Sequence, residues 1–152
     1  MALDADSIIG ELTSAASASG AFDAVVAHEP KSAPAPTGVT CAVFVGDAGP
    51  IQSSGLQSLS FRIEFTARLY TAMIQEPADG IDPLLLRAAD AYTAYLAAHF
   101  TLAGAARYTD FLGSEGEGLR WVPGYITQDN KPFRIIDVIV PILINDLYPL
   151  SA

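Results

Sequence analysis

Residues 59–70, with the sequence LSFRIEFTARLY, alternate apolar and polar side chains along their whole length. Successive side chains of a β-strand point to opposite faces of the sheet, so this period predicts one long strand with a buried face and a water-exposed face. Strands of this kind are typical of antiparallel sheets that are covered on one side. The apolar side chains expected in the core include Phe61, Ile63 and Phe65. The charged side chains expected on the exposed face are Arg62, Glu64 and Arg68.

Two segments on either side of this strand predict helices. In residues 4–19 the apolar side chains recur at helical spacing, and Asp4 or Asp6 can serve as the N-cap. A second helix is expected over residues 82–100, with Asp82 as its N-cap and a proline at the first helical position. Its core-facing side chains are expected to be Leu85, Ala89, Tyr92, Leu96 and Phe100.

The remaining apolar segments predict further strands, separated by turns rich in Gly, Pro, Asn and Asp. A loop is expected over residues 46–56, and a hairpin turn over residues 128–131. The order is helix, three strands, helix, three strands, which predicts an α+β domain with a mostly antiparallel sheet and two main helices packed on one face. The further strands are expected at residues 21–28, 39–45, 107–112, 119–128 and 133–144.

The composition indicates one folded domain that spans residues 1–152. Apolar residues make up 51% of the chain and charged residues only 16%, which excludes intrinsic disorder. A chain of this length is the size of a single domain. The lone cysteine, Cys41, excludes a disulfide framework, and its place in an apolar strand favours a buried, inert thiol.

The charge balance argues against a surface that grips nucleic acid. Eight Lys and Arg side chains face seventeen carboxylates, for a net charge of −9. Proteins that bind the phosphate backbone need a basic surface, which this chain lacks. An acidic start argues against a signal peptide, and the longest apolar run, residues 135–144, is too short to span a bilayer. We therefore expect a protein of the cytoplasm type with no membrane partner.

No motif in the chain predicts catalysis, a cofactor or a metal. The two histidines, His28 and His99, lie far apart in the sequence, and neither has a nucleophile beside it. Residues 113–118, GSEGEG, look superficially like a phosphate-binding loop but lack its lysine and carry two carboxylates. A flexible acidic loop is the expected structure there.

Asp137 is the most informative polar residue, because it interrupts the apolar run of the last strand. A carboxylate in such a place needs an arginine, a backbone donor or an aqueous face. It is therefore either an ion-pair or subunit-contact residue, or a catalytic acid with a perturbed pKa. The charged face of residues 59–70 is likewise either a solvated face with cross-strand pairs or a protein-contact surface.

Several segments of the chain resemble the tail terminator proteins of long-tailed phages that infect actinobacteria. The resemblance touches most of the chain and lies in the order and spacing of the segments, none of which is a catalytic motif. The segments are His28-Glu29-Pro30-Lys31-Ser32-Ala33-Pro34, residues 40–45, Ser53-Ser54-Gly55-Leu56, Gln75-Glu76-Pro77, Ile81-Asp82-Pro83, Asp110-Phe111-Leu112-Gly113, Gly124-Tyr125, and Arg134 with Asp137 ahead of Pro141 and Asp146.

The resemblance implies a structural virion protein that is not an enzyme. Such subunits form a ring, here expected to be a hexamer, that caps the head-proximal end of the tail tube and stops its polymerisation. The ring presents a surface to the neck, so the implied partners are further copies of the chain, the tail tube protein and the neck proteins. DNA passes through the ring without tight binding. The implied location is the tail–neck junction of the virion, with the host cytoplasm as the site of assembly.

The residues themselves suggest how such a ring forms. Pro141 cannot donate to a sheet ladder, so part of the sheet is expected to stay open. Residues 29–38, rich in proline, read as an extended connector that reaches a neighbouring subunit. The residues expected at a subunit or tube interface are Arg62, Glu64, Arg68, Lys31 and Asp137.

Two alternatives remain at this stage. One is a neck or head-completion connector, which shares the ring symmetry and the acidity. The other belongs to a different class: a small ligand-binding or hydrolase domain that uses Asp137 and a tyrosine such as Tyr125 in a pocket.

Overall fold

A computed structural model describes residues 2–151. It contains two α-helices and six β-strands, with two short 3₁₀ turns at Ala78–Gly80 and Leu102–Gly104. The main elements are α1 (Ala5–Ala18), β1 (Ala24–Val26), β2 (Thr40–Pro50), β3 (Ser58–Ala72), α2 (Ile81–Ala98), β4 (Tyr108–Thr109), β5 (Arg120–Gln128) and β6 (Lys131–Pro149).

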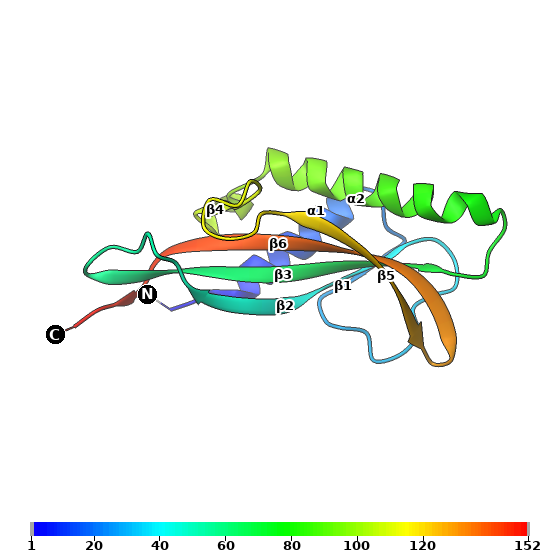
Figure 1. Cartoon of the computed structure of the whole chain (residues 1–152), viewed down its shortest axis with the longest axis horizontal. Helices are drawn as coiled ribbons and strands as arrows, with labels where there is room; N and C mark the ends of the chain where they lie inside the picture. Colours follow the sequence, from blue (N-terminus) through cyan, green and yellow to red (C-terminus); the bar gives the residue numbers. More distant parts are fainter. Residues whose placement is uncertain (1, 152) are drawn as a thin grey trace.

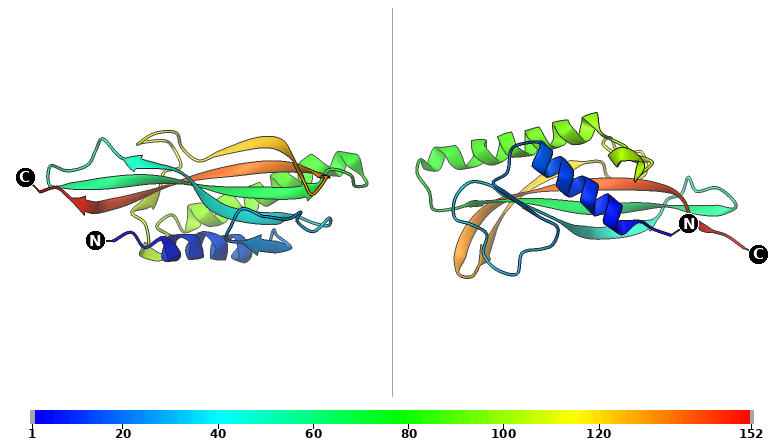
Figure 2. Two further views of the ribbon diagram at one scale, coloured as in Figure 1. Left: turned by 90° about the horizontal axis from the view of Figure 1, so that it is seen from below. Right: turned by 180° about the vertical axis from the view of Figure 1, so that it is seen from behind.

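The six strands form one sheet with the order β1-β2-β3-β6-β4, and β5 pairs with β6 along the same edge as β4 (Figure 1). Only the short β1 runs parallel to its neighbour; all other pairs are antiparallel. Both helices lie on one face of this sheet, and the other face carries no helix (Figure 2). The predicted α+β class, with a mostly antiparallel sheet and two helices on one face, is confirmed.

The core lies between the helices and the sheet. The buried stripe of α1 and the buried stripe of α2 pack against alternate residues of the three long strands, as the helical and strand periods require. Tyr92 of α2 is fully buried, and its hydroxyl donates to the Leu12 carbonyl oxygen of α1 at 3.1 Å, which joins the two helices. The sheet residues of this core are Val39, Cys41, Val43, Ile63, Phe65, Ala67, Leu69, Ile136, Val138, Val140, Ile142, Ile144 and Leu147.

The long strand β3 follows its predicted period. Ile63 and Phe65 are buried, as expected, whereas Phe61 is only partly buried. Phe61 lies near the end of the sheet that runs past the helices, between Pro50 of β2 and Ile144 of β6, and its ring meets that of Tyr148 edge-on at 5.2 Å. The helices cover the middle of the sheet but not this end, so Phe61 is less buried than Ile63 and Phe65.

The predicted helix boundaries need correction at α2. The N-cap is Gly80 and not Asp82, because the helix begins two residues earlier than predicted, at Ile81. The helix ends at Ala98, and the next residue, His99, leaves the helical region with φ −130° and ψ 47°. Phe100 therefore leaves the core-facing stripe and is 51% exposed, contrary to the prediction. At α1, Asp4 is the N-cap and accepts from the Ser7 amide.

Pairing with β3 also changes the predicted strands. β2 continues to Pro50 across a bulge between Val45 and Ala48, so much of the loop expected over residues 46–56 is strand. β6 likewise extends to Pro149, and the strand expected over residues 107–112 shrinks to Tyr108–Thr109. The hairpin turn is where it was predicted, with Asp129 and Asn130 at positive φ.

Pro141 lies at a local gap in the ladder, as expected, because β5 pairs with β6 only as far as Ile139 and β4 pairs only with Ile142 and Leu143. It lies within β6 opposite Glu64 of β3, and its carbonyl oxygen accepts from the Asp110 amide at 2.9 Å. Its ring nitrogen therefore faces the break between β4 and β5, where no ladder hydrogen bond is needed.

Residues 29–38 fold back on their own chain instead of extending away from it. The Gln128 side chain donates to the Pro30 carbonyl oxygen, and the Ala33 amide donates to Asp129 Oδ2 at 2.6 Å. Ala33 also packs against a small second core on the helix-free face, made by Ala42, Tyr70, Phe133 and Ile135. The expected free connector is thus tied to the tip of the β5–β6 hairpin.

No helix in residues 2–151 is both long enough and apolar enough to cross a membrane.

Candidate functional site on the open face of the sheet

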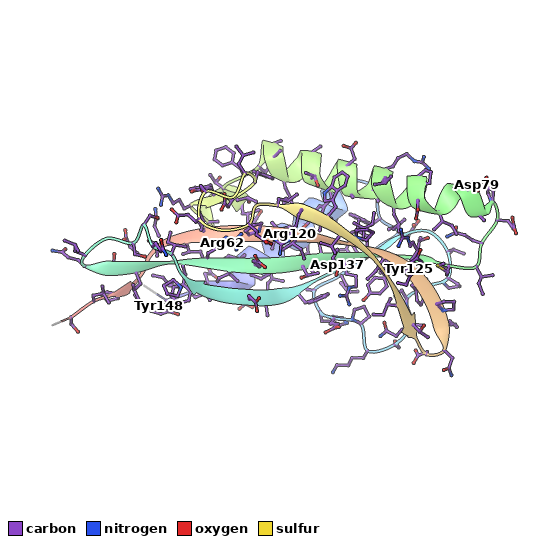
Figure 3. All side chains as sticks on the ribbon, viewed as in Figure 1. Arg62, Asp79, Arg120, Tyr125, Asp137 and Tyr148 are labelled. Carbon is purple, nitrogen blue, oxygen red and sulfur yellow. The ribbon has the colours of Figure 1, made fainter. Side chains whose placement is uncertain are left out.

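The helix-free face of the sheet, called the open face below, carries the charged side chains that the sequence singled out. Alternation along β3 places Arg62, Glu64 and Arg68 on this face. The strand register then sets Arg68 directly opposite Asp137 of β6. Figure 3 shows Arg62, Arg120 and Asp137 along this part of the sheet.

Arg68 and Asp137 form a bidentate ion pair. The Nε and Nη2 atoms of Arg68 donate to the two carboxylate oxygens of Asp137 at 2.7 and 3.1 Å, and both side chains are 18% exposed. The hydrogen bond to Asp137 raises the pKa of Arg68 above its usual range. Arg68 also lies over the Phe44 ring and within 3.7 Å of a Glu29 carboxylate oxygen. Of the alternatives that the sequence left open for Asp137, the structure shows the ion pair with an arginine.

Arg62 is the centre of a second cluster. Its Nη1 donates to Glu64 Oε1 at 2.7 Å, and its Nη2 donates to the Glu117 carbonyl oxygen. The same Glu64 lies 3.6 Å from Arg120 of β5, so one carboxylate joins two arginines from neighbouring parts of the sheet. The buried Nε of Arg62 finds no hydrogen-bond partner in the described chain, and lies 3.9 Å from Asp110 Oδ2.

Asp110 is a buried carboxylate whose role the sequence reading missed. It accepts from the backbone amides of Gly113, Ser114 and Glu115 at 2.8–3.1 Å, and from the Ser114 hydroxyl. Burial alone would raise the pKa of Asp110, but these donors together hold it below its ordinary value. An aspartate followed by Gly-Ser three residues later is the signal that could have predicted this turn.

The loop over residues 113–118 is therefore fixed, not the free acidic loop that was expected. Gly113 has φ +82°, and a Cβ on it would lie 2.6 Å from the Gly116 carbonyl oxygen. A Cβ on Gly118 would lie 2.4 Å from the Phe111 carbonyl oxygen. The glycines let this turn close over Arg62, and Asp110 holds it there.

The other candidate residues lie apart from these clusters. Lys31 is exposed in residues 29–38 and forms no salt bridge with any described residue. His28 is exposed just before this segment, and His99 stacks on Tyr95 at the end of α2 with ring centroids 4.1 Å apart. Cys41 is buried in the core, and burial raises the pKa of its thiol to about 12, as predicted for an inert cysteine.

Asp137 and Tyr125 do not share a pocket. Tyr125 pairs with Arg134 in the β5–β6 register, and Arg134 lies on the face opposite to Asp137. The Arg134 guanidinium lies 4.4 Å from the centre of the Tyr125 ring and donates to Asp82 of α2 at 2.9 Å. The two side chains of the hydrolase alternative thus lie on different faces of the sheet.

The surface carries several open hollows. A hollow of about 360 Å³ has Asp79, Asp82, Tyr125 and Arg134 among its lining residues, and one of about 230 Å³ has Glu11, Tyr95 and His99. One of about 590 Å³ between α1 and β1 is lined by Thr13, Ser14, Ser17, Ala18, Val25 and Ala27, none of which titrates. Another of about 310 Å³ lies beside Arg62 and Glu64, which are already paired. Among residues 2–151 there is no group of three His, Cys, Asp or Glu side chains placed to hold a metal ion.

The arrangement suits recognition better than proton transfer. Asp137 and Glu64 each face an arginine, so neither carboxylate is placed as a free general base. The paired charges instead hold β3, β5 and β6 in register and give the open face alternating positive and negative points. No protein-family model matches the chain, and no curated protein matches it.

Proposed function

We propose that the chain is a structural subunit of a phage tail terminator ring, without a catalytic role. In this proposal identical subunits, six in number, form a ring on the head-proximal end of the tail tube, stop its polymerisation and offer a surface to the neck proteins. The sequence resemblance supports the assignment to the phage tail. The open face of the sheet supports a role in contacts between proteins.

The observation that carries the proposal is the one-sided cover of the sheet. Both helices lie on one face, while the open face carries the partly buried Arg68–Asp137 pair and the Arg62–Glu64–Arg120 cluster; Figure 3 labels Arg62, Arg120 and Asp137. Ion pairs that are fixed within one subunit give its surface a constant pattern of positive and negative charge. The paired charges cancel, so they add nothing to the net charge of that subunit. Such a face suits a repeated contact between rigid, identical subunits or with the tube.

The acidity of the chain supports the passage of DNA. A net charge of −9 opposes the phosphate backbone, so a channel lined by this subunit would let DNA slide instead of holding it.

The neck or head-completion connector is the second candidate, because it has the same symmetry and charge. Electron microscopy of gold-labelled protein that is added separately to purified tail tubes and to portal-side rings distinguishes the two. A terminator binds at one end of each tube, whereas a connector binds the portal-side rings and leaves the tubes bare. Binding along the tube walls, or to neither particle, would contradict the proposed function.

A further inference from the structure

The sheet ends at β1, and the outer edge of this strand has no strand partner (Figure 1). β1 pairs only with β2, in parallel, and no other group of residues 2–151 forms a backbone hydrogen bond to it. On an edge strand, every second residue directs its N–H and C=O groups away from the sheet. The outer edge of β1 therefore offers unused backbone donors and acceptors.

A hollow lies on each face of this edge. The one on the helix side, called the α1 hollow below, has a volume of about 590 Å³ and lies between β1 and α1. The one on the other face has a volume of about 210 Å³ and lies between β1 and residues 30–35. Val25 of β1 lines the first and Val26 the second, as the alternation of a strand requires. A segment laid along β1 would therefore direct its own side chains alternately towards the two hollows.

The lining of the α1 hollow indicates which side chains fit it. All of its lining side chains are small and none is charged: Thr13, Ser14, Ser17, Ala18, Val25 and Ala27. Small side chains leave room for a large one from a partner, and the three hydroxyl groups offer hydrogen bonds to its polar end. A charged side chain would find no counter-charge among these residues. The hollow thus fits large, uncharged side chains such as tyrosine or glutamine.

We infer that the β1 edge binds an extended segment of another protein, which adds to the sheet as a further strand and directs large, uncharged side chains into the α1 hollow. Backbone hydrogen bonds along a sheet edge, together with side-chain pockets beside it, are a recurring way of binding extended peptides. The inference goes beyond the proposed ring and does not depend on it.

The strands of a second copy are poor candidates for this place. The outer part of β2 contains a bulge and ends in Pro50, β5 contains Pro123, and Asp146 near the end of β6 has φ 50°. Bulges, prolines and left-handed residues interrupt regular pairing. The β1 strand of a second copy would bring only Val25 and Ala27 to the helix side, and these are no larger than the side chains already there. A regular strand with larger side chains has to come from another protein.

A capped heptapeptide of alternating Thr and Tyr is the probe, because it is uncharged and places every Tyr on one face of a strand. It is titrated into the isotope-labelled full chain, and binding is followed by the amide resonances. The shifts should centre on residues 13–18 and 24–27. The exchange of the β1 amides with solvent should slow when the peptide is bound.

Two N-methylated forms of the peptide test whether the backbone pairs with β1. One form is methylated on the amides of its Tyr residues and the other on those of its Thr residues. These two sets of N–H groups point to opposite sides of a strand, so only one set faces β1. One form should therefore bind at least about tenfold more weakly than the unmodified peptide, and the other within about twofold of it.

The variant S17F tests the α1 hollow. Ser17 is exposed, so a phenylalanine there should fill the hollow and weaken peptide binding by about tenfold while thermal unfolding stays unchanged. The matched control is A97F, which adds the same ring to the exposed side of α2 and should bind as the unmodified chain does.

Three results would overturn the inference: equal binding of the two methylated peptides, full binding by S17F, or no binding at about 1 mM peptide. A fourth is protection of the β1 amides that rises with the concentration of the chain alone, because the edge would then be covered by a second copy.

Discussion

Asp137 of β6 lies directly opposite Arg68 of β3, and the arginine donates to both of its carboxylate oxygens, at 2.7 and 3.1 Å. The pair lies on the open face, where each side chain is 18% exposed. A bidentate pair that is partly shielded from water couples its two strands more strongly than an exposed ion pair does. The ion pair therefore stabilises the register between β3 and β6 in the middle of the sheet.

A double-mutant cycle with R68A and D137A measures the interaction energy between these two side chains. Each single variant should lower the free energy of unfolding in urea, and the double variant should lose about 1–3 kcal/mol less than the sum of the two. Arg87 and Asp90, both exposed on α2, provide a control cycle that should be additive. Additivity of R68A and D137A within about 0.5 kcal/mol would show that the pair does not couple the strands.

The core position of Phe65 predicts a large loss of stability on truncation. Phe65 is 3% exposed and packs in the main core, so F65A should lower the free energy of unfolding by about 3–5 kcal/mol through the cavity that it leaves. F100A removes the same atoms from a residue that is half exposed, and its loss should be less than half as large. A loss below about 1 kcal/mol for F65A would mean that the buried face of β3 is assigned wrongly.

The pKa of Asp110 predicts a pH dependence of folding. Because this pKa is lowered in the folded state, the ionised carboxylate stabilises the fold above the ordinary aspartate value of about 3.9. That stabilisation is lost as the pH falls below this value and through the folded-state pKa. D110N should therefore be less stable than the unmodified chain at pH 7, by on the order of 1–2 kcal/mol, and the difference should shrink towards pH 2.

Urea unfolding between pH 7 and pH 2 measures this difference. D47N serves as the control, because Asp47 is an exposed carboxylate in the bulge of β2. A difference between D110N and the unmodified chain that stays constant down to pH 2 would contradict the role given to the Asp110 carboxylate.

Much of the architecture follows from side-chain periods in the sequence. The alternation of residues 59–70 predicts β3 and its two faces, and the interruption of an apolar strand by Asp137 predicts a polar partner or water for its carboxylate, of which an arginine was one alternative. Both predictions hold because they depend on the alternation of a strand, which pairing with neighbours does not alter.

The features that the sequence did not predict depend on contacts between distant segments. Residues 46–50 have the composition of a loop, but β3 provides a partner for them and they extend β2 as far as Pro50. The folding back of residues 29–38 depends on Gln128 and Asp129, far along the chain. The Arg62 cluster includes the loop over residues 113–118, which Asp110 holds in place. The sequence of β3 alone does not predict that this loop lies against Arg62.

Duplex DNA should bind the protein negligibly at physiological salt. The net charge of −9 opposes the phosphates, and Arg62, Arg68, Arg120 and Arg134 are engaged with carboxylates. A mobility-shift titration with a duplex of mixed sequence checks this. Micromolar binding that weakens as salt is added would contradict it.

The length distribution of tail tubes tests the central claim most directly. Purified tube subunits are allowed to polymerise with and without this protein, and the tubes are measured by electron microscopy. The account predicts that the protein arrests growth, so that tubes stay short and each carries a ring with a central hole at one end. Tubes that elongate equally with and without the protein, and that carry no ring at their ends, would contradict it.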